Sequence, residues 1–185
     1  MIRMAHQFTV SYRDDSLAIF RQYKAHAEKA FAQLSDEQLM QQLDEESNSI
    51  AQIVKHVAGN MRSRWTDFLT TDGEKPDRNR DSEFTSPPES REEIMKLWND
   101  GWAILFGALE PLSDEDMGRT ITIRGEPHSV MQAIQRQVAH YAMHIGQIVF
   151  IGKHLKSRDW QSLTIPKNRS ADFNSRVAAG EASQR

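Results

Sequence analysis

Cysteine is absent from this chain, so disulfides, thiolate metal ligands and a cysteine nucleophile are excluded. Long apolar runs are absent as well, since no segment approaches the roughly 20 apolar residues that a membrane-spanning helix needs. The first stretch, MIRMAHQFTVSYRDD, holds no apolar run long enough for a signal peptide. We therefore expect a cytoplasmic protein with no membrane partner.

An excess of positive charge is also missing. The 23 basic residues are outnumbered by 26 acidic ones, and no segment concentrates basic residues on one face. Nucleic acid is therefore not an expected partner. Hydrophobic residues make up 38% and charged residues 26%, a balance typical of globular proteins, and 185 residues suit a single domain.

Four long segments carry apolar residues at helical spacing and are predicted to be α-helices. They cover about residues 11–34, 49–71, 90–111 and 129–154. Ser90 and Ser129 are expected to cap the third and fourth helices, and Ser49, Asn48 or Ser47 the second. The pattern predicts an all-α fold, a four-helix bundle.

The connections between these helices are long, so tight up-and-down turns are not required. Ser35 to Gln38 resemble a capping box and predict a short turn of helix. Residues 72–90 form a polar loop with three prolines, and loops of this length are often functional. The alternating residues 120–123, followed by Arg124-Gly125-Glu126-Pro127, predict a short hairpin before the last helix. We expect a bundle domain over residues 1–165 and a C-terminal tail over 166–185.

Two histidines, His140 and His144, lie four residues apart in the last predicted helix. This spacing places two side chains on one helix face, about 5–6 Å apart at Cβ, so both imidazoles can reach one metal ion. His56 lies at the edge of the apolar stripe of the second predicted helix. Three imidazole nitrogens around one point match a metal site with an open position. The alternative is three ordinary histidines hydrogen-bonded at the edge of the core, because spacing alone is a weak signal.

The other four histidines have no such pairing. We interpret His6, His128 and His154 as surface residues. His26, at the margin of the first predicted helix, is either an extra ligand, a residue that orients a ligand, or an ordinary packed side chain.

Several segments resemble one known superfamily. Ser49–Met61, SIAQIVKHVAGNM, resembles the second helix of the DinB superfamily. Its continuation Arg62–Pro76 is most similar to a branch described only as of unknown function. Arg124–His128, Gln135–His140 and His144–Gln147 match the same branch.

The resemblance covers about residues 10–165, and its most specific element is one histidine on the second helix with a histidine pair on the last. It implies a DinB-like four-helix bundle, usually a homodimer, with a divalent metal centre at His56, His140 and His144. Better-understood relatives are metal-dependent transferases that use a low-molecular-weight thiol and an isomerase that uses a thiol cofactor.

The resemblance favours a metal-dependent enzyme that acts on a small-molecule substrate. It would be a transferase with a small thiol cosubstrate, since the chain itself has no thiol, or a hydrolase that uses metal-bound water. The alternative is a non-enzymatic, stress-associated bundle that binds a metal or a small ligand. Zinc or nickel is the expected ion, and iron and manganese are alternatives because imidazole suits several metals.

Further polar residues lie near these histidines in the sequence. Asn60, Gln137 and Tyr141 are candidate catalytic residues, and the alternative is that they only orient the metal ligands. In the 72–90 loop, Arg78 and Arg80 would either bind an anionic substrate or pair with acidic residues of the same loop.

The second predicted helix carries an additional apolar stripe. Met61, Trp65 and Leu69 are displaced from its main core face. A helix with two apolar faces needs two neighbours. The second neighbour is either another subunit or a wider face of the same bundle.

Overall fold

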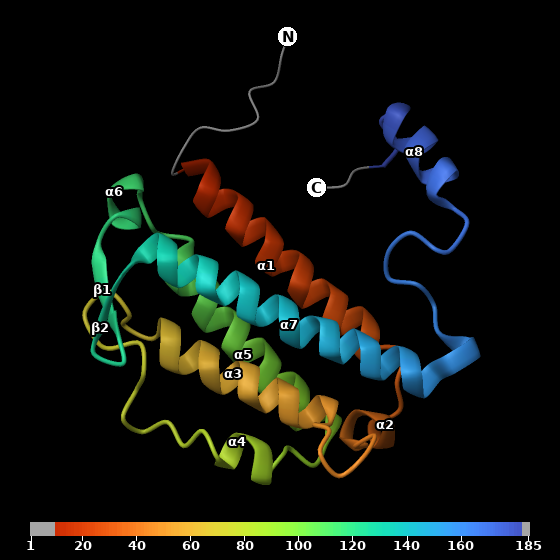
Figure 1. The fold of residues 1–185 in the computed structure, drawn as a ribbon, viewed down its shortest axis with the longest axis horizontal. Helices are drawn as coiled ribbons and strands as arrows, with labels where there is room; N and C mark the ends of the chain where they lie inside the picture. Colours follow the sequence, from red (N-terminus) through yellow and green to blue (C-terminus); the bar gives the residue numbers. More distant parts are fainter. Residues whose placement is uncertain (1–9, 183–185) are drawn as a thin grey trace.

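The computed structural model describes residues 10–182, and within them four long helices form a bundle (Figure 1). They are α1 (Val10–Phe31), α3 (Ile50–Trp65), α5 (Arg91–Leu109) and α7 (Val130–Lys156). Helix α3 packs along α5 and α1 along α7, with further contacts between α1 and α5 and between α3 and α7. The predicted all-α fold is confirmed. None of the described helices is both long and apolar enough to cross a membrane.

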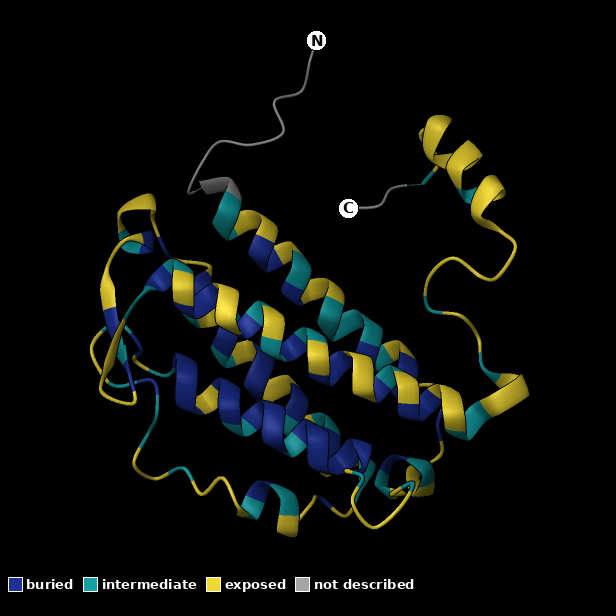
Figure 2. Ribbon diagram, in the orientation of Figure 1, coloured by how far each residue is buried: buried dark blue, intermediate teal, exposed yellow. Residues whose placement is uncertain are grey.

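Shorter elements connect and follow these helices. They are α2 (Asp36–Met40), α4 (Ser82–Thr85), α6 (Asp114–Met117), strands β1 (Thr120–Ile123) and β2 (Glu126–Ser129), the 3₁₀ turn η1 (Ser157–Asp159) and α8 (Ser170–Ala178). Helix α8 was not predicted, because the sequence pattern gave only a C-terminal tail over residues 166–185. It buries none of its residues (Figure 2), and its nine residues present only one pair of large apolar side chains at helical spacing, Phe173 and Val177, which is too short a pattern to predict a helix.

Serine caps fix where three of the four long helices begin. The side chains of Ser49, Ser90 and Ser129 each accept a hydrogen bond from a backbone N–H in the first turn of α3, α5 and α7. In α3 and α7, Gln52 and Gln132 complete a capping box by bonding back to the backbone of the cap residue. Ser49, rather than its two predecessors, is therefore the cap of α3.

Helix α3 ends earlier than predicted. The chain leaves the helix after Trp65 instead of continuing to Thr71, and Asp67 takes a left-handed conformation with φ of 48°. This turn brings the ring of Phe68 to 5.2 Å from the ring of Trp65, and Phe68 is buried there. Burial of an aromatic ring outweighs continuation of the helical hydrogen bonds.

The predicted hairpin is present. Strands β1 and β2 are antiparallel, with Thr120 opposite Ser129 and Ile123 opposite Glu126. The two turn residues, Arg124 and Gly125, both have positive φ, and their N–H groups donate to the carboxylate of Asp72 at 2.8 Å. The hairpin is thereby tied to the loop that follows α3.

Aromatic side chains join three of the helices in the core. The rings of Phe20 (α1) and Trp102 (α5) lie 5.8 and 5.9 Å from the ring of Tyr141 (α7). Trp98 continues the cluster, 5.4 Å from both Trp102 and Phe31. All five side chains are buried, so this cluster forms the centre of the hydrophobic core.

The additional apolar stripe on α3 faces the chain's own core. Met61 and Trp65 are fully buried, and Leu69 packs partly buried against the same core. The stripe is therefore a wide face within the bundle and gives no support to a second subunit. The homodimer stays a prediction that rests on the family resemblance.

Candidate metal centre

Three histidines meet between α3 and α7. The Nε2 atom of His140 lies 3.1 Å from Nε2 of His144 and 3.4 Å from Nε2 of His56. Two nitrogens bound to one ion at about 2.0–2.1 Å lie about 3.3–3.4 Å apart at the tetrahedral angle. Among the described residues, this is the one group of three or more histidines and carboxylates with ligand atoms close enough to share an ion. The predicted juxtaposition of the three residues is present.

Each imidazole is oriented through its other nitrogen. The Nδ1 atoms face side-chain oxygens of Glu83 (2.8 Å from His56), Gln137 (3.2 Å from His140) and Gln147 (2.8 Å from His144). These oxygens can only accept, so each Nδ1 carries a proton. The three Nε2 lone pairs then point at one another, as in a metal site with oriented ligands.

The converging lone pairs fit a cation. With the proton of each ring on Nδ1, the Nε2 lone pairs converge and repel one another until a positive charge joins them. Protonation of a ring is opposed: burial first, then the neighbouring histidines and Arg78 and Arg64, lower the pKa of His140 to about 3. Burial also lowers the pKa of His144. The donor set therefore suits a divalent ion better than a proton.

Glu83 is held in its charged form by two partners. Burial by itself would raise its pKa, but hydrogen bonds from His56 and Arg78 outweigh this and hold the pKa of the carboxyl below its usual value. Arg78 donates from Nε to Oε1 at 2.8 Å and from Nη2 to Oε2 at 3.0 Å. Arg78 therefore pairs with an acidic residue of its own loop, and the guanidinium of Arg80 lies 5.7 Å from the ring of Phe84.

The segment around α4 covers His56. The ring of Phe84 stacks on the imidazole at a centroid distance of 5.0 Å. From α3, Gln52 donates to the carbonyl of Phe84 at 2.7 Å, and Lys55 donates to the carbonyl of Ser82 at 2.8 Å. The long polar loop is thus fastened to α3 and carries Glu83 to the metal centre.

The three candidate catalytic residues lie close to the histidines in different roles. Gln137 contacts the Nδ1 atom of His140. The hydroxyl of Tyr141 donates to Oδ1 of Asn60 at 3.0 Å and accepts from Nε1 of Trp65 at 3.3 Å. Burial raises the pKa of Tyr141, so it stays a neutral phenol. Tyr141 and Asn60 therefore form a pair inside the core beside the metal centre.

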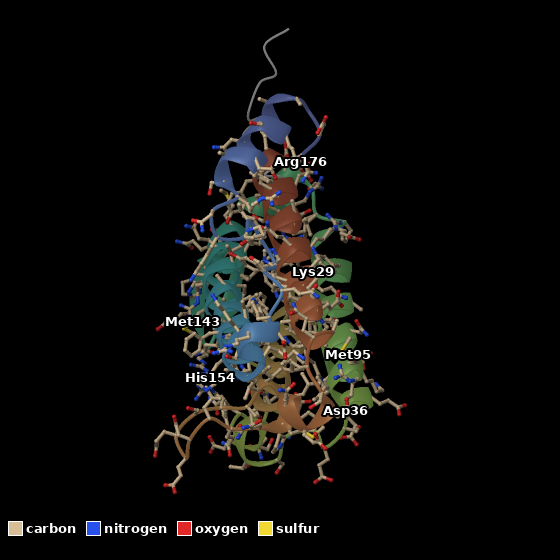
Figure 3. All side chains as sticks on the ribbon, turned by 90° about the vertical axis from the view of Figure 1, so that its right-hand side faces the viewer. Lys29, Asp36, Met95, Met143, His154 and Arg176 are labelled. Carbon is tan, nitrogen blue, oxygen red and sulfur yellow. The ribbon has the colours of Figure 1, made fainter. Side chains whose placement is uncertain are left out.

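The remaining histidines do not join this group. His154 is exposed on the outer side of α7, as is Met143 (Figure 3). His128 lies in the hairpin, where Nδ1 contacts the carbonyl of Glu126 at 3.0 Å. His26 on α1 supplies no ligand atom to the triad. His6 lies outside the described residues.

Two contacts of the centre were not predicted. Gln147 follows His144 by three residues, just as Gln137 precedes His140 by three, so helical spacing could have revealed it. Glu83 lies 27 residues from His56 in a loop, and no local pattern links the two.

The fold and the site together define a helical bundle with a candidate three-histidine metal centre. A family model described as "Protein of unknown function (DUF1572)" matches residues 7–169. The match covers most of the chain, which therefore belongs to this family. No curated protein and no solved structure matches the chain.

Proposed function

We propose that this protein binds one divalent metal ion through His56, His140 and His144 and is a metal-dependent enzyme. The observation that carries the proposal is the convergence of three Nε2 lone pairs while each Nδ1 is held by an acceptor. The resemblance to the DinB superfamily supports the same ligand set. Zinc and nickel are the first candidates, and iron and manganese also suit imidazole.

The ligand number favours catalysis over a purely structural ion. Structural zinc sites are closed by four protein ligands, whereas catalytic sites keep an open position. Among the described residues only three ligands converge, and the nearby carboxylate of Glu83 is engaged by His56 and Arg78.

When bound, the ion supplies a Lewis acid that polarises a substrate and lowers the pKa of a coordinated thiol or water. The chain's own residues orient the three rings through their Nδ1 atoms, and the loop with Phe84 covers one side of His56. Because the chain has no cysteine, a reacting thiol would come from a small cosubstrate. We therefore propose a transferase that uses such a thiol, with hydrolysis as the alternative reaction.

Metal analysis of untagged protein tests the proposal. Wild-type protein should take up one divalent ion per chain at neutral pH, and His56→Ala should lose most of it because one of three ligands is gone. His154→Ala is the matched control, since this histidine lies exposed on the same helix as His140 and His144 and contributes no ligand atom to the triad. A folded His56→Ala protein with full metal content refutes the site, and so does a wild-type protein that binds no ion.

Turnover then separates an enzyme from a metal-binding bundle. The metal-loaded protein should couple a small thiol to an electrophile, and removal of the ion should abolish the reaction. A metal-loaded protein without turnover, whose melting temperature rises steeply with the ion, favours the non-enzymatic alternative.

A further inference from the structure

A cavity of about 710 Å³ lies between α3, α5 and the loop that covers them, and the three histidines of the metal centre do not line it. The loop of residues 72–90 runs along α3 (Figure 1), and its residues from Lys75 to Glu83 form one wall of the cavity. Small-molecule sites in proteins have volumes of about 300–1,000 Å³. The cavity is therefore large enough for a small-molecule ligand of its own.

The two helices give the cavity much apolar surface. A Cβ atom on Gly101 of α5 would lie only 3.1 Å from Cα of Ala58 on α3, so the helices are in close contact where both residues line the cavity. The other apolar side chains that α5 contributes are those of Leu97, Ala103 and Ile104. Leu97 and Ile104 are only partly buried, so an apolar group in the cavity would remove more of their surface from water.

Four basic and three acidic side chains line the cavity, and each of the acidic ones already has a basic partner. These pairs are Asp77 with Arg62, Glu83 with Arg78 and His56, and Asp100 with Lys96. Of the lining lysines, Lys75 lies near Asp67, Asp72 and Asp77, which favour its charge. The remaining cation is Lys55.

Lys55 has no carboxylate partner. Its ammonium group donates to the backbone carbonyl of Ser82 at 2.8 Å and to that of Ser86, and both acceptors are uncharged. Ser82 itself lines the cavity, so the ammonium lies at the cavity wall. An ammonium has three N–H donors, and two are used in these bonds. The third donor and the positive charge are available to a ligand.

We propose that this cavity binds a small carboxylic acid with an apolar body. Its carboxylate accepts a hydrogen bond from Lys55, and its body covers the apolar surface that α3 and α5 leave open. Bonds between an ammonium and a carboxylate are short and strong, and one ammonium balances one carboxylate charge, whereas a phosphate dianion would need a second cation. This ligand site is separate from the metal centre and does not depend on it.

Calorimetric titration of the metal-free protein with two matched probes tests the site. The probes are 4-phenylbutyrate and 4-phenylbutyramide, which have the same length and differ in the charge of the head group. Metal-free protein is used so that the acid cannot bind an ion at the triad. Wild type should bind one acid per chain and prefer it to the amide by about tenfold, because a hydrogen bond between charged groups has this strength. Lys55→Gln keeps a donor for the carbonyls but removes the charge, so most of this preference should disappear while the affinity for the amide stays unchanged.

A second variant locates the site. Ala103 lines the cavity and is exposed, so Ala103→Trp places an indole in the cavity without disturbing the buried core. This variant should lose affinity for both probes. Ala139→Trp and Lys153→Gln are the matched controls, because both residues are exposed on α7 and neither lines the cavity. Both controls should keep the wild-type affinities.

The outcomes distinguish this inference from the proposed function. If neither probe binds to wild type, or both bind equally, the carboxylate site is overturned and the metal centre stands. An unchanged preference in a folded Lys55→Gln protein, or unchanged affinities in a folded Ala103→Trp protein, also overturns it. If Lys55→Gln does not fold, the preference of wild type and the result for Ala103→Trp decide. A protein that binds the acid in the cavity but takes up no metal ion refutes only the metal centre.

Discussion

Gly59 on α3 offers a way to disturb the metal centre without touching a ligand. A Cβ atom at this position would lie 2.4 Å from Oε1 and 3.0 Å from Cδ of Glu83. In Gly59→Ala, the carboxylate must move by at least about 0.6 Å to relieve the contact. It is held by His56 and Arg78 at 2.8–3.0 Å, so this movement breaks or stretches the bond that orients His56.

The expected result is weaker metal binding in a protein that stays folded. Loss of a group that orients a metal ligand lowers metal affinity by about tenfold to a hundredfold. Alanine in place of a helical glycine favours the helix by about 0.5–1 kcal/mol, which offsets part of the lost contact between Glu83 and His56. Metal affinity is measured by competition with a chromophoric chelator, and the fold by circular dichroism.

A second helical glycine supplies the control. Gly107 on α5 is exposed, and a Cβ atom there would meet nothing within 4 Å. Gly107→Ala should therefore raise stability by about 0.5–1 kcal/mol and leave metal affinity unchanged. Wild-type affinity in a folded Gly59→Ala protein would refute the role given to Glu83.

Two further predictions concern the buried polar groups. Tyr141→Phe leaves Asn60 and Trp65 each without a partner and should lower the free energy of unfolding by about 1–3 kcal/mol in urea titrations; an unchanged value would contradict the pairing. In metal-free protein, the folded-state pKa of His140 lies far below its ordinary value of about 6.5, so stability should be greatest above pH 6.5 and fall as the pH drops towards about 3, because only the unfolded chain then takes up the proton. Urea titrations across this range should show a shallower fall for His140→Gln, and equal slopes would count against the explanation.

Local patterns in the sequence predicted the parts of the molecule that depend on neighbouring residues. The starts of α3, α5 and α7 follow from serine caps, such as Ser129, whose partner lies three residues further along the chain. The pair His140 and His144 follows from helical spacing, and the hairpin follows from alternation and a turn signal. For the pairing with His56, the family resemblance was decisive because no local rule brings α3 beside α7.

The parts that the sequence left unpredicted depend on long-range packing. Helix α3 stops at Trp65 because Phe68 finds a place in the core, which no helix signal reports. Glu83 reaches His56 only after the 72–90 loop is fastened to α3.

The residues of the candidate metal centre are unevenly distributed along the chain, and this distribution affects the order in which the centre can form. Four of its residues, Gln137, His140, His144 and Gln147, lie within one stretch of α7, whereas His56 is 84 residues away from His140. A helix forms in about a microsecond or less, but contacts between distant segments wait for the chain to close a long loop. If the protein binds an ion as proposed, α7 would therefore offer two ligands during folding before α3 arrives with the third. Metal added to the unfolded protein should therefore change the rate at which α3 docks against α7, because this docking is the later of the two events.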